Sequence, residues 1–245
     1  MFQPLNRVKP NVLVRHDPTV LDNKPEMARL VARIFSSWAL IEYRLSLLLV
    51  RILGAEADAA LAIFATLTAQ HLQLTALEAA AKAALSETEF DVFKAAIGVA
   101  DSVQTPRNQL AHYIWASSPD LPDELLLAHP KSAKERDREF TRALETGKSI
   151  AEAAELNSYD PADVFVVKEK DLQRASRDIE IASQVAFLAV MYLDGAFRGR
   201  RKVPSEVRYV MTREQVFQQL SDQRLFRDAW DRIQADRKKS RQQKT

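Results

Sequence analysis

The 245-residue chain has no cysteine and only five glycines. Without cysteine it can form no disulfide framework, no thiolate metal site and no cysteine nucleophile. With so few glycines it has few turn residues for many short strands. Ala, Leu, Arg, Glu and Gln dominate instead, and these residues lose little freedom in a helix. The composition therefore predicts a mainly α-helical protein, with one sizeable domain and appendages or two small domains.

Long uninterrupted apolar runs are also absent. The first 20 residues contain three prolines and scattered charges, which does not suit a secretory signal. The most apolar stretch, residues 37–53, is interrupted by three charged residues, which argues against a membrane span. We therefore expect a soluble, cytoplasmic protein with no membrane partner.

Apolar residues that recur at three- and four-residue spacing predict several long helices. The first should begin near Pro25 and end at Gly54, because proline suits the first helical turn and glycine suits the C-cap. Ser86 followed by Glu89 predicts a capping box that opens another helix. Further helices are expected over residues 56–85, 132–156, 171 to about 195, and 212 to about 237. Within 56–85, His71 falls on the apolar face, as a core histidine would.

Pro106 allows two interpretations of the helix that follows Ser86. It could sit in the first turn of a new helix capped by Thr105, or it could kink one continuous helix. The apolar spacing continues across the proline, which favours a continuous helix ending at Ser117-Ser118-Pro119. Beyond it, residues 124–128 and 164–167 predict two short strands that pair with each other.

Together these elements predict a three-part organisation. Residues 1–22 should form an irregular N-terminal arm, 23–200 an up-and-down helical bundle with a strand and charged-helix insertion at 119–168, and 201–245 a basic helical extension. Residues 195–245 hold 14 Lys/Arg and 6 Asp/Glu, which gives a net charge of +8. The first 194 residues hold 21 Lys/Arg and 27 Asp/Glu, which gives a net charge of −6. A basic terminus can bind a polyanion such as RNA, or it can simply be a solvated tail.

One short segment combines a phosphate-binding cation with a proton-transfer group. It reads Arg107-Asn108-Gln109-Leu110-Ala111-His112. An arginine can hold a phosphate with a fork of donors, and a histidine can move a proton near neutral pH. At about 100° per residue, Asn108 and His112 share one helical face, and the long side chain of Arg107 can reach round to it. The alternative is that Arg107 pairs with a nearby acid and His112 packs at a helix contact.

This segment resembles the Arg-x4-6-His motif of the HEPN superfamily, in which a polar residue often follows the arginine. The helical layout over roughly residues 25–197 is similar too, with an early helix that carries Trp38 and Glu42. Ile114 stands where one branch of the family has a tyrosine two residues after the histidine, so the resemblance does not extend to that branch. The resemblance implies an all-α up-and-down bundle that dimerises with its motif helices across a two-fold axis. Many members are metal-independent ribonucleases, and several are toxins or phage-defence effectors.

By this resemblance, Arg107, Asn108 and His112 would join their symmetry mates in one composite catalytic site. Two copies of His112 would supply the general base and the general acid, and Arg107 would neutralise charge in the transition state. The expected products are a 2′,3′-cyclic phosphate and a 5′-hydroxyl. Glu42, Tyr113 and Trp115 are candidate supporting residues. Alternatively, Glu42 forms a salt bridge, Tyr113 covers the dimer interface, and Trp115 packs against its neighbours. Trp38 is expected in the core.

Other catalytic signatures are absent from the sequence. It has no glycine-rich phosphate loop, no Gly-x-Ser-x-Gly elbow and no His-Glu-x-x-His pattern. We therefore expect no metal and no cofactor. The function that the sequence predicts is a homodimeric endoribonuclease with RNA as its substrate and an antitoxin or regulatory protein as a further partner. The alternative is a non-catalytic helical module that binds RNA, a nucleotide or a protein.

Overall fold

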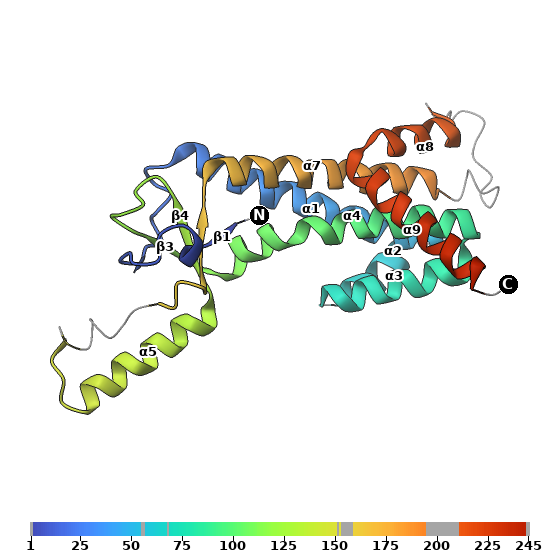
Figure 1. Cartoon of the computed structure of the whole chain (residues 1–245). Helices are drawn as coiled ribbons and strands as arrows, with labels where there is room; N and C mark the ends of the chain where they lie inside the picture. Colours follow the sequence, from blue (N-terminus) through green and yellow to red (C-terminus); the bar gives the residue numbers. More distant parts are fainter. Residues whose placement is uncertain are drawn as a thin grey trace. The chain divides into compact units, whose positions relative to one another are not determined.

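The computed structural model describes residues 2–54, 57–67, 69–150, 152, 159–194 and 211–243. Over these ranges the chain is mainly α-helical and contains one antiparallel sheet (Figure 1). It divides into two compact units, Met1–Phe35 with Gln104–Arg177, and Ser36–Val103 with Asp178–Thr245. None of the helices within the described ranges combines the length and the apolar character that crossing a membrane requires. The boundary predicted at residue 200 lies outside the described residues.

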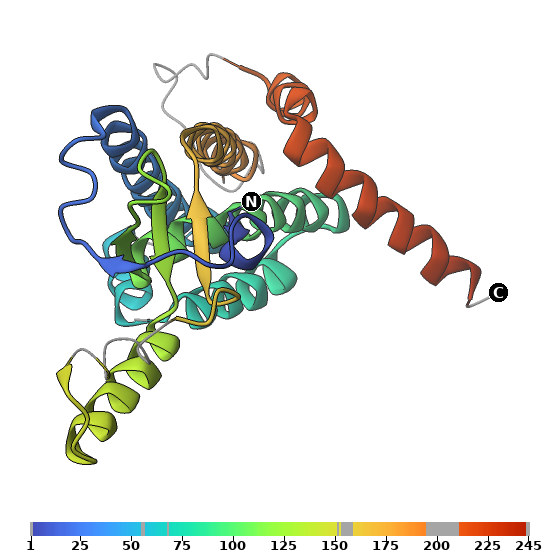
Figure 2. The same cartoon turned by 60° about the vertical axis from the view of Figure 1, so that its left-hand side comes forward.

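The first unit contains a five-stranded antiparallel sheet (Figure 2). Its strands are β1 (Gln3–Pro4), β2 (Arg15–His16), β3 (Ile114–Ser117), β4 (Leu125–Ala128) and β5 (Val164–Val167). Their order across the sheet is β1-β5-β4-β3-β2. Leu126 of β4 lies opposite Ala116 on one side and Val166 on the other. The two strands predicted from sequence are thus confirmed as neighbours, β4 and β5.

One face of the sheet forms a core with the short 3-10 helix η1 (Leu5–Arg7) and with α5 (Pro130–Glu145). The buried members of this core are Leu5, Ala116, Leu126, Ala128, Ala133, Tyr159, Val164 and Val166. All four residues of β4 are buried, so the opposite face of this strand is covered as well. A strand buried on both faces has a continuous apolar sequence, which is why β4 was predictable.

The sheet is larger than predicted, and the first 22 residues are not wholly irregular. β1 pairs with β5, and β2 pairs with β3, so the N-terminal segment supplies both edge strands. Each edge strand has two residues, too few to show an alternating pattern in the sequence. The helix containing Pro106 also ends earlier than predicted, at His112 rather than near Ser117. The residues that follow it include Ile114 and Trp115, types that favour the strand they form.

The second unit is a bundle of helices. The helices that lie wholly in it are α2 (Ala57–Thr66), α3 (Gln70–Ala84), α8 (Arg213–Asp222) and α9 (Arg224–Gln242). Three long helices supply residues to both units: α1 (Pro25–Leu53), α4 (Glu87–His112) and α7 (Glu169–Tyr192). Buried side chains of this bundle include Trp38, Ile41, Leu48, Ile52, Leu77, Phe93, Ile179, Leu188, Leu220 and Phe226.

The sequence signals for helix ends are largely confirmed. α1 begins at Pro25, and Gly54 follows it with a φ of +61°, a left-handed conformation that glycine adopts without steric cost. Before α4, the Ser86 N–H and hydroxyl both donate to Glu89 Oε2 at 2.8 Å, and the Glu89 N–H donates to Ser86 Oγ at 3.4 Å. This is the predicted capping box.

Several predicted helices have different bounds in the structure. The single helix predicted over residues 56–85 is two helices in the structure, α2 and α3. Between them, the Leu67 carbonyl oxygen accepts a hydrogen bond from Gln73 Nε2 at 2.8 Å. The single helix predicted over residues 212–237 is also two helices in the structure, because Gln223 adopts an extended conformation between α8 and α9. His71 is exposed rather than in the core. Residues 56, 153–156 and 195, which bound other predictions, lie outside the described residues.

The basic C-terminal extension is packed on the bundle over its described part, residues 211–243. The Phe217 ring lies 6.0 Å from that of Tyr192 on α7 and 5.3 Å from that of Trp230 on α9, centroid to centroid. Phe226 stacks on Trp230 at 6.1 Å. Burying such rings provides much of the energy that holds helices together. The first turns of α9 are therefore held by an aromatic cluster made of Tyr192, Phe217, Phe226 and Trp230.

Candidate functional site at the end of helix α4

The motif residues lie in the last two turns of α4, which runs without a break through Pro106. The structure therefore supports the continuous helix over a new start at Thr105. Gln109 and Leu110 are buried in these turns, whereas His112 is exposed and Arg107 and Asn108 are partly buried. The imidazole of His112 is thus accessible to solvent, whereas the Nε atom of Arg107 is buried.

Arg107 and Asn108 contact each other directly. Arg107 Nη1 donates a hydrogen bond to Asn108 Oδ1 at 3.1 Å. Because residues four apart share a helical face, Asn108 also lies one turn before His112. A cation and an accessible proton-transfer group are both components that phosphodiester cleavage without a metal can use.

Tyr113 and Trp115 have structural contacts at the junction between α4 and β3. The Tyr113 ring meets the edges of His129 at 5.0 Å and Phe165 at 5.8 Å, centroid to centroid. Trp115 Nε1 donates to the Leu110 carbonyl oxygen at 2.9 Å. The last carbonyls of a helix lack partners within it, so this indole satisfies one of them. These contacts favour the packing alternative for Trp115 and place it on a strand rather than on the motif helix. For Tyr113 they show packing against aromatic rings of its own chain, a role that the sequence did not indicate.

Glu42, the other candidate supporting residue, is engaged with a neighbour on α1. Its Oε1 accepts a hydrogen bond from Trp38 Nε1 at 2.8 Å. Trp38 is 1% exposed and lies in the core, as predicted. A buried indole N–H requires an acceptor, and Glu42 provides one at the surface. Within α1, Glu42 thus serves as the acceptor for the buried Trp38 indole. Glu42 belongs to the second unit and the motif to the first.

Two further histidines have partners that the sequence did not indicate. His129 is the N-cap of α5, and its Nδ1 accepts a hydrogen bond from the Lys131 N–H at 3.1 Å. His16 lies against Tyr159 with ring centroids 5.6 Å apart. Pro130 directly after His129 is a helix-start signal that could have identified the first role. The contact of His16 with Tyr159 could not be predicted, because the two residues are far apart in sequence and are brought together only when the sheet forms.

Arg136 and Tyr159 complete the surroundings of His16. The Arg136 guanidinium carbon lies 4.5 Å from the centroid of the Tyr159 ring. At this distance the face of the ring attracts the cation. Partial burial of the ring lowers the pKa of the His16 imidazole, the charge of Arg136 lowers it further, and the charge of Asp137 acts in the opposite direction. This group is therefore a second candidate for pH-dependent behaviour, separate from the motif in sequence.

Metal ligation is not visible in the described residues: they contain no group of three or more His, Asp or Glu side chains placed to hold an ion. No model of a protein family matches the chain, and comparisons with curated proteins and with solved structures find no match.

Proposed function

We propose that this protein is a metal-independent endoribonuclease that acts as a homodimer, with Arg107, Asn108 and His112 in its active site. The observation that carries the proposal is the position of the motif in the last two turns of α4, with the His112 side chain exposed and the neighbouring core residues turned inward. The resemblance of the motif to that of HEPN ribonucleases supplies the reaction. A role as a toxin or phage-defence effector, with an antitoxin as partner, belongs to the same proposal.

In the proposed reaction, His112 of one copy takes the proton from a ribose 2′-hydroxyl. The 2′ oxygen attacks phosphorus, the bond to the 5′ oxygen breaks, and the second His112 gives its proton to that leaving oxygen. The products are a 2′,3′-cyclic phosphate and a 5′-hydroxyl. Arg107 stabilises the charge that develops on the phosphoryl oxygens, and Asn108 orients Arg107 through the 3.1 Å hydrogen bond. Because the nucleophile is the 2′-hydroxyl, DNA is not a substrate.

The test is cleavage of labelled RNA by the purified protein in excess EDTA. We expect cleavage by wild type, and losses on the order of 10²–10⁴-fold for His112→Ala, the usual contribution of a general acid or base. Arg107→Ala should cause a loss of similar size. The matched control is His71→Ala, which removes an exposed histidine from α3 and should leave the rate unchanged. If His112→Ala cleaves RNA as fast as wild type, the proposed site is wrong.

A second candidate function is RNA binding without cleavage. The observation that favours it is the set of exposed cations in the last turns of α9, Lys238, Lys239 and Arg241. Under this alternative the protein retains RNA without producing cyclic phosphate ends, and His112→Ala has no effect. The cleavage assay with product analysis therefore separates the two functions.

A further inference from the structure

The two halves of α9 are held by different kinds of contact. The first half carries Phe226 and Trp230, which belong to the aromatic cluster described above. Residues 232–243 contain five Lys/Arg and one Asp, and Ile233 is their only large apolar residue. Polar contacts must therefore hold the second half. A helical segment with few buried apolar contacts opens at a lower free-energy cost than the rest of a fold.

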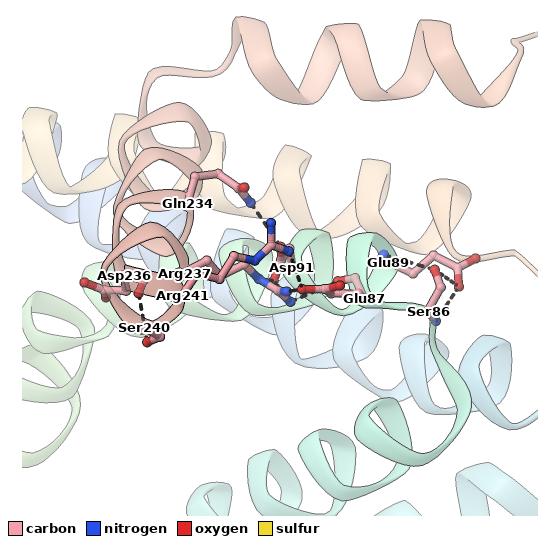
Figure 3. Close-up of polar contacts among 9 residues, drawn as sticks. All are labelled: Ser86, Glu87, Glu89, Asp91, Gln234, Asp236, Arg237, Ser240 and Arg241. Carbon is pink, nitrogen blue, oxygen red and sulfur yellow. Dashed lines mark hydrogen bonds and ion pairs between the residues drawn. The ribbon is translucent and has the colours of Figure 1, made fainter. Parts of the chain in front are cut away.

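Two carboxylates near the N-terminus of α4 supply those polar contacts (Figure 3). Arg237 donates to Asp91 Oδ1 from Nε at 2.9 Å and from Nη2 at 2.6 Å, and it also pairs with Glu87. Gln234 Nε2 donates to Asp91 Oδ2 at 3.0 Å. Arg241 Nη2 lies 3.4 Å from Glu87 Oε1. We call Glu87 and Asp91 the acidic latch.

The interface between α4 and α9 at the latch is not tightly packed. A solvent-open groove of about 470 Å³ lies there, lined by the latch residues and by Phe90, Lys94, Ile233 and Asp236. Solvent therefore reaches the latch side of the second half of α9 through this groove. The ion pairs, rather than close packing, set its position.

The four cations that follow Arg232 in this segment divide into two groups. Arg237 and Arg241 face the latch, whereas Lys238 and Lys239 are exposed on the same turns. Carboxylate and phosphate oxygens both suit the donor fork of arginine. A chain of phosphates could therefore take the place of the latch carboxylates on the arginines while also contacting the lysines.

We propose that the last turns of α9 bind the phosphate backbone of single-stranded RNA, and that Glu87 and Asp91 compete with RNA for Arg237 and Arg241. The choice of RNA as the polyanion rests on the proposed function. The segment has no apolar stripe after Ile233, which a helix lying on a membrane surface would need. The exposed lysines and the two arginines thus form an RNA-binding arm, and in the free protein its arginines are paired with the carboxylates of the acidic latch.

The experiment measures binding of the full chain to a fluorescent 2′-O-methyl oligonucleotide by anisotropy, in EDTA, over a series of salt concentrations. The 2′-O-methyl group blocks cleavage, so binding is read independently of nuclease activity. Each phosphate contact in a single strand contributes about 0.7 to the slope of log affinity against log salt. We expect Lys238→Gln with Lys239→Gln to reduce the slope by roughly 1.4. A matched pair of exposed lysines on other helices, Lys82→Gln with Lys170→Gln, should keep the wild-type slope.

The latch is tested by Glu87→Gln with Asp91→Asn, which removes both charges while keeping the side-chain shapes. We expect at least about threefold tighter binding and a slope steeper by roughly 1.4, since two more arginines are released to the RNA. Hydrogen exchange of residues 233–242 should also become faster in this variant without RNA. This readout detects release of the arm, and thermal unfolding monitored at Trp230 verifies that the aromatic cluster remains folded.

Three outcomes would overturn the inference. A wild-type salt slope in the double lysine variant would show that the arm does not contact phosphates. Unchanged or weaker binding by the double latch variant, with unchanged hydrogen exchange, would show that the carboxylates do not compete with RNA. Tighter association with phosphatidylserine vesicles than with the oligonucleotide would assign the arm to membranes. Absence of RNA cleavage would count against the proposed nuclease function and leave these binding results as they stand.

Discussion

The four histidines of the chain differ in what surrounds them, and these surroundings determine which of them is available for chemistry. His112 and His71 are exposed, His129 is used as a helix cap, and His16 lies against Tyr159. His16 is exposed as well, and of the three exposed histidines only His112 closely follows an arginine whose guanidinium donates to a neighbouring amide. Spacing in the sequence suggested the importance of His112 but misplaced His71, because an apolar helical stripe does not reveal which of its members lies at the edge.

His16 should make the stability of the protein depend on pH. Burial and the charge of Arg136 lower the pKa of its imidazole in the folded state, against the weaker effect of Asp137. The unfolded chain therefore binds a proton more readily than the folded one. The stabilisation is complete above the unfolded pKa of about 6.5 and is lost as the pH falls below it.

We expect the free energy of unfolding, measured with urea between about pH 5 and pH 8, to fall on acidification less steeply in His16→Asn than in wild type. His71→Asn, which changes an exposed histidine in the other unit, is the control. Equal pH dependence in His16→Asn and wild type would show that the environment of His16 does not bias its protonation.

At the scale of single elements, α4 illustrates how one residue can serve two purposes. Glu89 Oε2 accepts the hydrogen bonds of the capping box from Ser86, and Glu89 Oε1 pairs with Arg213 of α8 at 2.7 Å. The carboxylate is 9% exposed, so its pairing with Arg213 is largely shielded from solvent. The start of α4 and the start of α8 are thereby joined through a single side chain.

This arrangement predicts unequal costs for two substitutions at the start of α4. Ser86→Ala should lower the free energy of unfolding by about 1 kcal/mol, the usual cost of losing an N-cap. Glu89→Ala should cost roughly 1.5–3 kcal/mol more, because it also leaves a partly buried arginine without this carboxylate. Urea unfolding followed by circular dichroism measures both. Ser149→Ala, in an exposed capping box with Glu152, should cost less than Ser86→Ala. Equal costs for Ser86→Ala and Glu89→Ala would contradict the double role of Glu89.

Elements with local signals were predictable, whereas elements that depend on distant partners were not. Pro25, Gly54 and the Ser86–Glu89 box defined helix ends because a cap is a contact between residues close in sequence. The break between α2 and α3 was missed, since the alanine-rich sequence carries no glycine or proline there. β1 and β2 were missed for a different reason: each has two residues and is defined only by its pairing with β5 or β3.

For the molecule as a whole, the sequence predicted the helical class and the position of the motif in a helix. It left open one domain or two, and it did not predict where the two compact units divide. That division cuts across α1, α4 and α7, so no linker or change of composition marks it. The same limit applies to the candidate site. Local periodicity places Arg107, Asn108 and His112 on α4, whereas a composite site needs a second copy of the chain, which no pattern within one sequence specifies.

The need for a second copy yields a prediction about mixed dimers. If both His112 side chains act in one site, a dimer of one wild-type and one His112→Ala chain lacks either the base or the acid and is inactive. When equal amounts of the two chains are coexpressed, random pairing leaves about a quarter of the dimers fully wild type. RNA cleavage per wild-type chain should therefore fall to about half, because only half of the wild-type chains have a wild-type partner.

Coexpression with His71→Ala is the control and should cause no loss, since that variant keeps both histidines of the site. Sedimentation of the same preparations establishes whether dimers are present. If dimers are present and cleavage per wild-type chain is undiminished by His112→Ala, each chain carries a complete site of its own. The second proton-transfer group would then have to come from within one chain rather than from the partner's copy of α4.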